Sequence, residues 1–234
     1  SCLMPRLFLA VGFAASLCLA ACCWAAEFEI GKVPAGLKPL PVPTENPLTA
    51  AKIELGKQLY FDTRLSRDNT ISCASCHDPK KGWSNGEAFA TGVRSQVGGR
   101  SAPTIINTAY SDLQFWDGRA KDLQEQAGGP LVNPIEMGTT EQHVVEQLNG
   151  IPGYVAAFKQ AFSGQANPIT FENVRNSIAL FESTLVTPNA PEAEVLTGKA
   201  VVGLSGQRRA AEKLLDMGAK AALVEAFRET PGAV

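Results

Sequence analysis

Residues 73–77 read Cys73-Ala74-Ser75-Cys76-His77, two thiols separated by two small residues and followed at once by an imidazole. This is the C-x-x-C-H pattern of c-type haem attachment. The chemistry needs this spacing, because both thiols add to the vinyl groups of one porphyrin and the adjacent histidine binds its iron. The sequence therefore predicts one covalently bound haem c, held by Cys73 and Cys76, with His77 as the proximal metal ligand.

A C-x-x-C pair without the histidine would also be compatible with zinc or with a redox dithiol. A structural zinc site needs two further ligands, and His143 is the only other histidine of the chain, so it cannot complete four-coordination. A thioredoxin-like dithiol normally occurs near a βαβ pattern, which is missing here. The other cysteines all lie in the N-terminal apolar stretch, which excludes a multi-disulfide scaffold. They are Cys2, Cys18, Cys22 and Cys23.

The composition is that of an ordinary globular protein. The chain has 234 residues, of which 45% are hydrophobic and 19% charged, and its formal net charge is −2. These values exclude disordered and fibrous classes. No basic patch is present, so we expect no nucleic-acid partner.

The N-terminus has the layout of a secretory signal. An apolar run over 7–26 follows Arg6 and ends in small residues, and cleavage would remove 1–25 as a signal peptide. A Leu-Ala-Ala-Cys box also resembles a lipoprotein signal, in which 1–21 is removed and Cys22 carries a lipid anchor. A third interpretation is an uncleaved anchor, since about 18 apolar residues can span a bilayer. All three predict export, with membrane contact only through this segment.

The next part of the chain predicts one helix followed by long loops. Prolines over 26–46 favour an extended lead-in. Asn46 followed by Pro47 predicts the start of a helix over 47–60, with apolar residues at every fourth position. Glycine, proline, serine and asparagine recur over 62–137, which predicts loops with short helices.

Further helices are predicted after these loops. Thr140 is expected to cap a short helix and Pro152 to begin another. Thr170 is expected to cap the clearest helix, because apolar residues follow at steps of three and four. A last helical stretch is expected from Ser205. With no repeats and no β alternation, the predicted fold class is all-α, with long loops around the haem.

Five blocks of sequence, in this order, carry a family resemblance. The run 55–185 resembles the N-terminal, peroxidatic domain of the bacterial di-haem cytochrome c peroxidase family, which includes the methylamine-utilisation branch. The resemblance implies a cytochrome c-like haem domain over 47–190, followed by a linker and a remnant of a second haem domain over 191–234. The blocks are LGKQLYFD (55–62), ISCASCH (71–77), GRSAPT (99–104), QFWDGRA (114–120) and IEM (135–137).

The resemblance implies roles for several side chains. It places Trp116 between two haems as an electron relay, and Gln126 and Glu136 on the peroxide side. There a carboxylate can take a proton from peroxide and deliver it to the leaving oxygen, while an amide holds the peroxide or orients the carboxylate. Arg100 and Arg119 are candidates for pairing with the haem propionates. The alternatives are a packed core indole at Trp116, a capping or solvated carboxylate at Glu136, and ordinary surface ion pairs at both arginines.

The sequence departs from the family before the GRSAPT block. Many members place there a histidine that caps the resting iron, whereas residues 91–98 contain none. We therefore expect the distal face of the haem to be open or water-bound, as in the methylamine-utilisation branch. Ligation by His143 or by Met137 remains an alternative.

The second departure concerns the C-terminal domain of the family. That domain carries a second C-x-x-C-H motif, but no cysteine or histidine follows His143 in this chain. We expect the electron-supplying haem to be absent and the sequence to be a truncated or frameshifted reading. Members of the family hold calcium between their two domains. Because the second domain is expected to be missing, calcium is not expected here.

The expected function is that of a periplasmic c-type haem peroxidase. It would reduce hydrogen peroxide to water with electrons from a small cytochrome c or cupredoxin. One alternative is a mono-haem electron carrier in which Met137 closes the sixth position of the iron. Two others are a haem oxidase acting on a partner protein and a nonfunctional gene remnant.

Overall fold

A computed structural model describes residues 30–34 and 37–187. Within these ranges the chain is helical, and its β contacts are isolated bridges and not strands. The all-α prediction is confirmed. The helices are α1 (Ala50–Phe61), α2 (Cys73–Cys76), α3 (Leu123–Val132), α4 (Glu141–Asn149), α5 (Pro152–Ala161) and α6 (Phe171–Ser183). Single 3₁₀ turns lie between them: η1 (Thr63–Leu65), η2 (Pro79–Lys81), η3 (Val93–Ser95) and η4 (Thr108–Tyr110).

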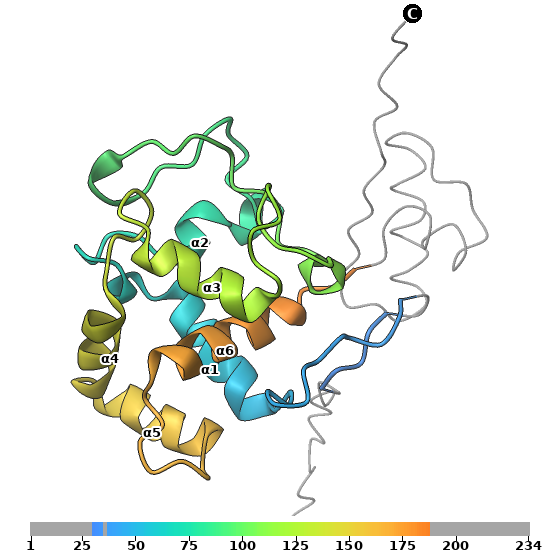
Figure 1. The fold of residues 1–234 in the computed structure, drawn as a ribbon, viewed down its shortest axis with the longest axis vertical. Coiled ribbons are helices and arrows are strands. Elements are labelled where there is room, and N and C mark those ends of the chain that lie inside the picture. The colour runs from blue at the N-terminus through green and yellow to red at the C-terminus, as the bar shows by residue number, and fades with distance from the viewer. Residues whose placement is uncertain (1–29, 35–36, 188–234) are drawn as a thin grey trace, which may run out of the picture.

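Helices α1 and α6 cross at the centre of the domain. Figure 1 shows them side by side, with α3 on one side and with α4 and α5 at one end. The crossing is close because Gly56 has no side chain, and a Cβ at this position would collide with the backbone carbonyl of Ser177. Leu55, Leu59 and Ile178 are almost fully buried around it. Truncating such a core residue to alanine typically costs about 2–5 kcal/mol.

The predicted helix starts are mostly correct. Thr140 caps α4, Pro152 is the first residue of α5, and Thr170 caps α6 through a hydrogen bond from Asn173 N. The predicted start of α1 is wrong, since the helix begins at Ala50 with Thr49 as its cap.

Asn46 has a tertiary role instead. It is buried, and its amide donates to the carbonyl of Asn176 and accepts a hydrogen bond from Lys52 Nζ. These contacts attach the lead-in segment to α6 and α1. Asn46 therefore makes tertiary contacts and does not cap α1 as the sequence predicted.

The prediction of loops with short helices over 62–137 agrees with the structure. Loops and single turns run from residue 62 to 122, with the four-residue α2 among them. The ten-residue helix α3 follows, although its sequence contains Gly128, Gly129 and Pro130. Proline has no N–H, so the carbonyl of Gln126 receives no helical hydrogen bond from residue 130.

The described residues contain no helix that combines the length and apolar character needed to cross a bilayer. The predicted signal segment, the lipid-anchor position Cys22 and the helical stretch from Ser205 lie outside the described residues.

Candidate haem site

Helix α2 is a single turn that holds both thiols. Its start is fixed by the backbone N–H of Ser72, which donates to Ser75 Oγ at 3.0 Å. The helix ends where His77 N donates to the carbonyl of Cys73 at 2.9 Å. From α1, Tyr60 Oη donates to the carbonyl of His77. The turn therefore presents Cys73, Cys76 and His77 as one rigid group, and both cysteines are free thiols.

The imidazole of His77 is fixed by backbone carbonyls. Its Nδ1 lies 2.8 Å from the carbonyl oxygen of Pro103 and 3.3 Å from that of Trp83. Carbonyl oxygens only accept hydrogen bonds, so Nδ1 carries the proton and Nε2 keeps its lone pair for a metal. Burial lowers the pKa of His77, which keeps the ring neutral. This is the usual arrangement of a ligating histidine whose second nitrogen is held by a carbonyl.

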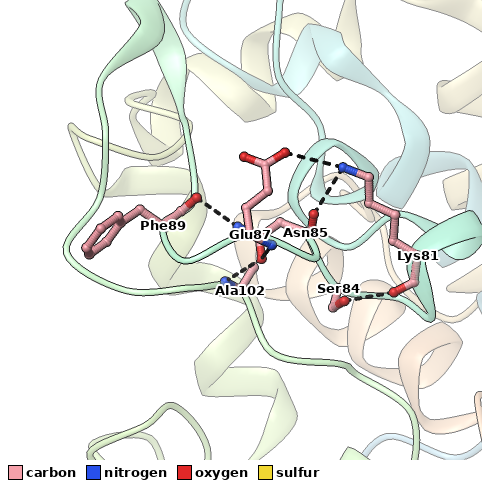
Figure 2. A network of polar contacts seen from close by, with 6 residues as sticks. All are labelled: Lys81, Ser84, Asn85, Glu87, Phe89 and Ala102. Carbon is pink, nitrogen blue, oxygen red and sulfur yellow. Dashed lines mark hydrogen bonds and ion pairs between the residues drawn. The ribbon is translucent and has the colours of Figure 1, made fainter.

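The loop that brings Pro103 to His77 is held by Asn85. Figure 2 shows that Asn85 Nδ2 donates to the carbonyl of Phe89, while Asn85 Oδ1 accepts from Ala102 N. Asn85 is buried. It therefore joins the two ends of the loop 89–102 and fixes the residue just before Pro103. Sequence reasoning missed both residues, although Pro103 belongs to the GRSAPT block.

One cavity of about 380 Å³ lies against α2. Its walls are the loops 90–105 and 114–119, the helices α3 and α6, and the turn around Glu136. It brings together every residue that the sequence singled out for haem binding or catalysis. These are Cys73, Cys76, His77, Arg100, Trp116, Arg119, Gln126 and Glu136.

Glu136 is half-buried in a tight turn after α3. Its Oε1 accepts from Asn133 Nδ2 at 2.9 Å. Burial raises the pKa of Glu136, and the charge of Arg119 and the hydrogen bond from Asn133 partly oppose this shift. The capping and solvated alternatives do not describe this carboxylate, because it faces the cavity.

Gly92 allows the distal loop to approach Glu136. A Cβ on Gly92 would collide with the backbone carbonyls of Ile135 and Glu136, and Val93 N donates to the Glu136 carbonyl at 2.8 Å. The close contact fixes the backbone of the predicted acid/base residue. A glycine in a loop gives no sequence signal for such a role.

Gln126 lies on α3 and is half-buried at the cavity wall. Its side-chain amide makes no hydrogen bond to another residue in the described ranges, so it is available to a ligand. Met137 also lines the cavity and is 2% exposed. His143 lies on α4 and is not among the residues that line this cavity.

Trp116 lies at the surface and not in the core. Its side chain is 58% exposed, and its Nε1 donates to the carbonyl of Ser101 at 3.0 Å. The alternative of a packed core indole is therefore wrong, and the electron-relay role of Trp116 stays a prediction. The indole bridges the loops on two sides of the cavity and has one face in solvent.

The two arginines differ. Arg119 pairs with Asp117 at 2.8 Å and stacks on Phe115, with 3.5 Å between its guanidinium carbon and the ring centroid. Arg119 thus forms the ordinary surface ion pair that was the alternative to pairing with a haem propionate. Arg100 is exposed at the cavity wall and forms no ion pair in the described part of the chain, so its guanidinium is free to pair with a ligand carboxylate.

Glu182 is a buried site residue that the sequence did not suggest. It lines the cavity from α6, and its Oε2 has no hydrogen-bond partner among the described residues. Its carboxyl group lies among the apolar residues on the buried face of α6. The sequence pattern predicts only core packing on that face, so it did not indicate a site residue.

These residues fit a c-type haem. The thiols of Cys73 and Cys76 and the Nε2 of His77 reach one largely apolar cavity, which also offers a free guanidinium at Arg100. The described residues contain no cluster of three or more histidine, cysteine or acidic side chains that could hold a bare metal ion.

Fold and site together define a helical c-type haem domain. The family model of the di-haem cytochrome c peroxidases matches residues 50–201. The chain belongs to this family, as the resemblance predicted.

Named relatives agree. Cytochrome c551 peroxidase of Pseudomonas aeruginosa is 41% identical over 175 residues, which cover 75% of this chain and 51% of that protein. Methylamine utilization protein MauG of Methylorubrum extorquens is 41% identical over 170 residues, covering 72% and 48%. A crystal structure of a MauG-like protein associated with microbial copper homeostasis superimposes with a TM-score of 0.68 at 28% identity, covering 76% of this chain and 52% of that one. The chain spans about half the length of the curated relatives it matches.

Proposed function

We propose that this chain forms the peroxidatic haem domain of an exported peroxidase, which reduces hydrogen peroxide to water with electrons from a small cytochrome c or cupredoxin. One observation carries the proposal: the same cavity holds His77, with its Nε2 available to iron, and the half-buried carboxylate of Glu136. A haem c bound through Cys73 and Cys76 supplies an iron that binds peroxide and accepts electrons.

Glu136 moves a proton between the two peroxide oxygens. The carboxylate accepts a proton from one oxygen, and the resulting carboxylic acid donates it to the other, which leaves as water. Because Asn133 holds Oε1, Oε2 is the atom that exchanges the proton. Burial raises the pKa of Glu136, which brings it closer to the working pH and makes it a better proton donor.

Gln126 positions the peroxide, and Trp116 takes part in electron delivery. The unpaired amide of Gln126 donates to peroxide or to Glu136 and restricts its orientation. Each peroxide consumes two electrons and two protons. The exposed indole of Trp116 provides a conjugated group between solvent and the cavity for electron delivery.

A second candidate is a haem oxidase that acts on a partner protein. The loop over 91–98, where the family resemblance implies a capping histidine in many members, contains none, and Gln96 Nε2 in this loop donates to the carbonyl of Pro134 at 2.9 Å. This contact fastens the loop to the Glu136 turn and leaves no imidazole over the cavity. It favours an open distal face, which both candidates need and the electron-carrier alternative does not.

The test uses chain matured with haem in a cytochrome c maturation host. We expect a covalent haem, a resting iron without sulfur-to-iron absorbance, and a rapid reaction with hydrogen peroxide in stopped-flow measurements. Glu136→Gln should slow that reaction by about 10²–10⁴-fold without changing haem content, whereas Glu125→Gln, at an exposed site on α3, should not. A low-spin iron inert to peroxide would instead identify an electron carrier. An oxidised state that outlasts the peroxide would favour the partner-protein oxidase.

A further inference from the structure

A buried carboxyl group in the haem cavity has no part in the reaction described above. Glu182 lies on α6 one helical turn after Ile178, and both side chains line the cavity beside Cys73. Glu182 is only 5% exposed. Its carboxyl group therefore interacts with the interior of the cavity and hardly with solvent.

This carboxyl group has neither a cation nor a full set of hydrogen bonds. Its Oε2 has no partner among the described residues, and none of the ion pairs in that part of the chain includes Glu182. A buried carboxylate without a partner is costly, so such groups normally bind a proton.

The ionisable groups that face Glu182 are neutral. Helix α1 presents Tyr60 and α2 presents Cys73; burial raises the pKa of both groups, and the charge of Glu182 raises it further. Tyr60 donates its hydroxyl proton to the carbonyl of His77, and haem attachment converts the Cys73 thiol into a thioether. From α3, α4 and η4, no charged group shifts the pKa of Glu182. Burial alone raises that pKa to about 8.

A haem iron held by His77 would add a variable charge to the cavity that Glu182 lines. Reduction from the ferric to the ferrous state removes one positive charge from the cavity. In a water-poor site such a change acts strongly on a nearby ionisable group. The ferric state favours the carboxylate and the ferrous state favours the carboxylic acid.

We propose that Glu182 couples proton transfer to electron transfer in this cavity: its carboxylate binds one proton from solvent when one electron from a donor reduces the iron, and releases that proton when the iron is reoxidised. The proposal rests on the haem site proposed above but not on peroxide turnover. Glu182 responds to the charge of the cavity and does not touch the reacting atoms. It is therefore not a catalytic residue. Its stored proton lies beside a site whose reaction consumes two protons.

The test is the pH dependence of the midpoint potential of the haem-loaded chain, measured by spectroelectrochemistry between pH 6 and 10. Wild type should show an interval in which the potential falls by about 59 mV for each tenfold decrease in proton concentration. Glu182→Gln should lack this interval. Glu136→Gln, a carboxylate on another wall of the same cavity, and Glu172→Gln, on the first turn of α6, should retain it.

The outcomes separate this proposal from the function on which it rests. Without covalent haem, the haem site itself is wrong. With haem bound, a slope that survives in Glu182→Gln, or that disappears in Glu136→Gln instead, overturns the role of Glu182. If Glu182→Gln does not load haem, the wild-type infrared difference spectrum decides. Reduction near pH 8 should produce a carboxylic-acid C=O band that persists in Glu136→Gln, and a spectrum without that band contradicts the proposal.

Discussion

Nδ1 of His77 lies 2.8 Å from the carbonyl oxygen of Pro103, 26 residues further along the chain. This contact selects the tautomer of the imidazole and orients its Nε2 toward the cavity. A histidine that binds iron next to two thioether links needs such a hydrogen bond to its second ring nitrogen, because the short α2 turn alone does not fix the rotation of its ring.

The first prediction concerns the residue that holds Pro103 in place. Asn85→Ala removes the partners of Phe89 O and Ala102 N. Each buried group left without a partner costs about 1–3 kcal/mol, so urea unfolding of the haem-loaded chain should show a clear loss of stability. The iron potential should also shift, because the His77 ring loses its support.

Glu87→Ala is the matched control, since Glu87 lies in the same network but is exposed and pairs only with Lys81. An exposed pair of this kind contributes little. Equal stability of Asn85→Ala and Glu87→Ala would contradict the role of Asn85.

The second prediction uses two glycines of the same loop. Gly92→Ala places a methyl group against the carbonyls of Ile135 and Glu136, whereas Gly99→Ala meets nothing within 4 Å. The first change should destabilise the chain by about 1–3 kcal/mol and slow the peroxide reaction, because the turn that carries Glu136 must move. Gly99→Ala should leave the free energy of unfolding unchanged. A normal rate in Gly92→Ala would show that the close contact does not position Glu136.

The third prediction is a pH profile. The peroxide reaction needs the ionised form of Glu136, so its rate should fall as the pH drops through the raised pKa of this carboxyl group. The hydrogen bond from Asn133 holds that pKa down. Asn133→Ala should therefore move the fall in rate to higher pH, and an unmoved profile would exclude Glu136 as the titrating group.

The fourth prediction concerns stability and Glu182. The pKa of this group is raised from 4.5 to about 8, so between these values the folded chain binds a proton that the unfolded chain does not. Stability should therefore decrease as the pH rises from about 5 to 8. In Glu182→Gln this part of the pH dependence should vanish in urea unfolding curves. A wild-type stability that rises over the same interval would mean that Glu182 is ionised in the fold.

Sequence reasoning predicted the residues of the site better than the backbone that arranges them. The motif at 73–77 and the ordered blocks identified side chains that the fold brings to one cavity. Helix caps such as Thr140 and Thr170 were readable because their hydrogen bonds are local. The start of α1 could not be predicted in this way, because the side chain of Asn46 forms a hydrogen bond to Asn176 of α6, which lies 130 residues further along the chain.

The loops were least predictable. Trp83 and Phe115 adopt positive φ values of 59° and 67°, which bulky side chains rarely accept. Trp83 supplies a carbonyl to His77, and Phe115 precedes Trp116 and stacks on Arg119. Tertiary contacts hold their backbone in this conformation, so no local sequence pattern predicts the positive φ values.

The most direct test of the haem site is peptide mass mapping of the chain after maturation with haem. We expect one porphyrin on the peptide that contains Cys73 and Cys76, and its loss when both are changed to alanine. Recovery of that peptide from folded protein with two unmodified thiols would contradict the account.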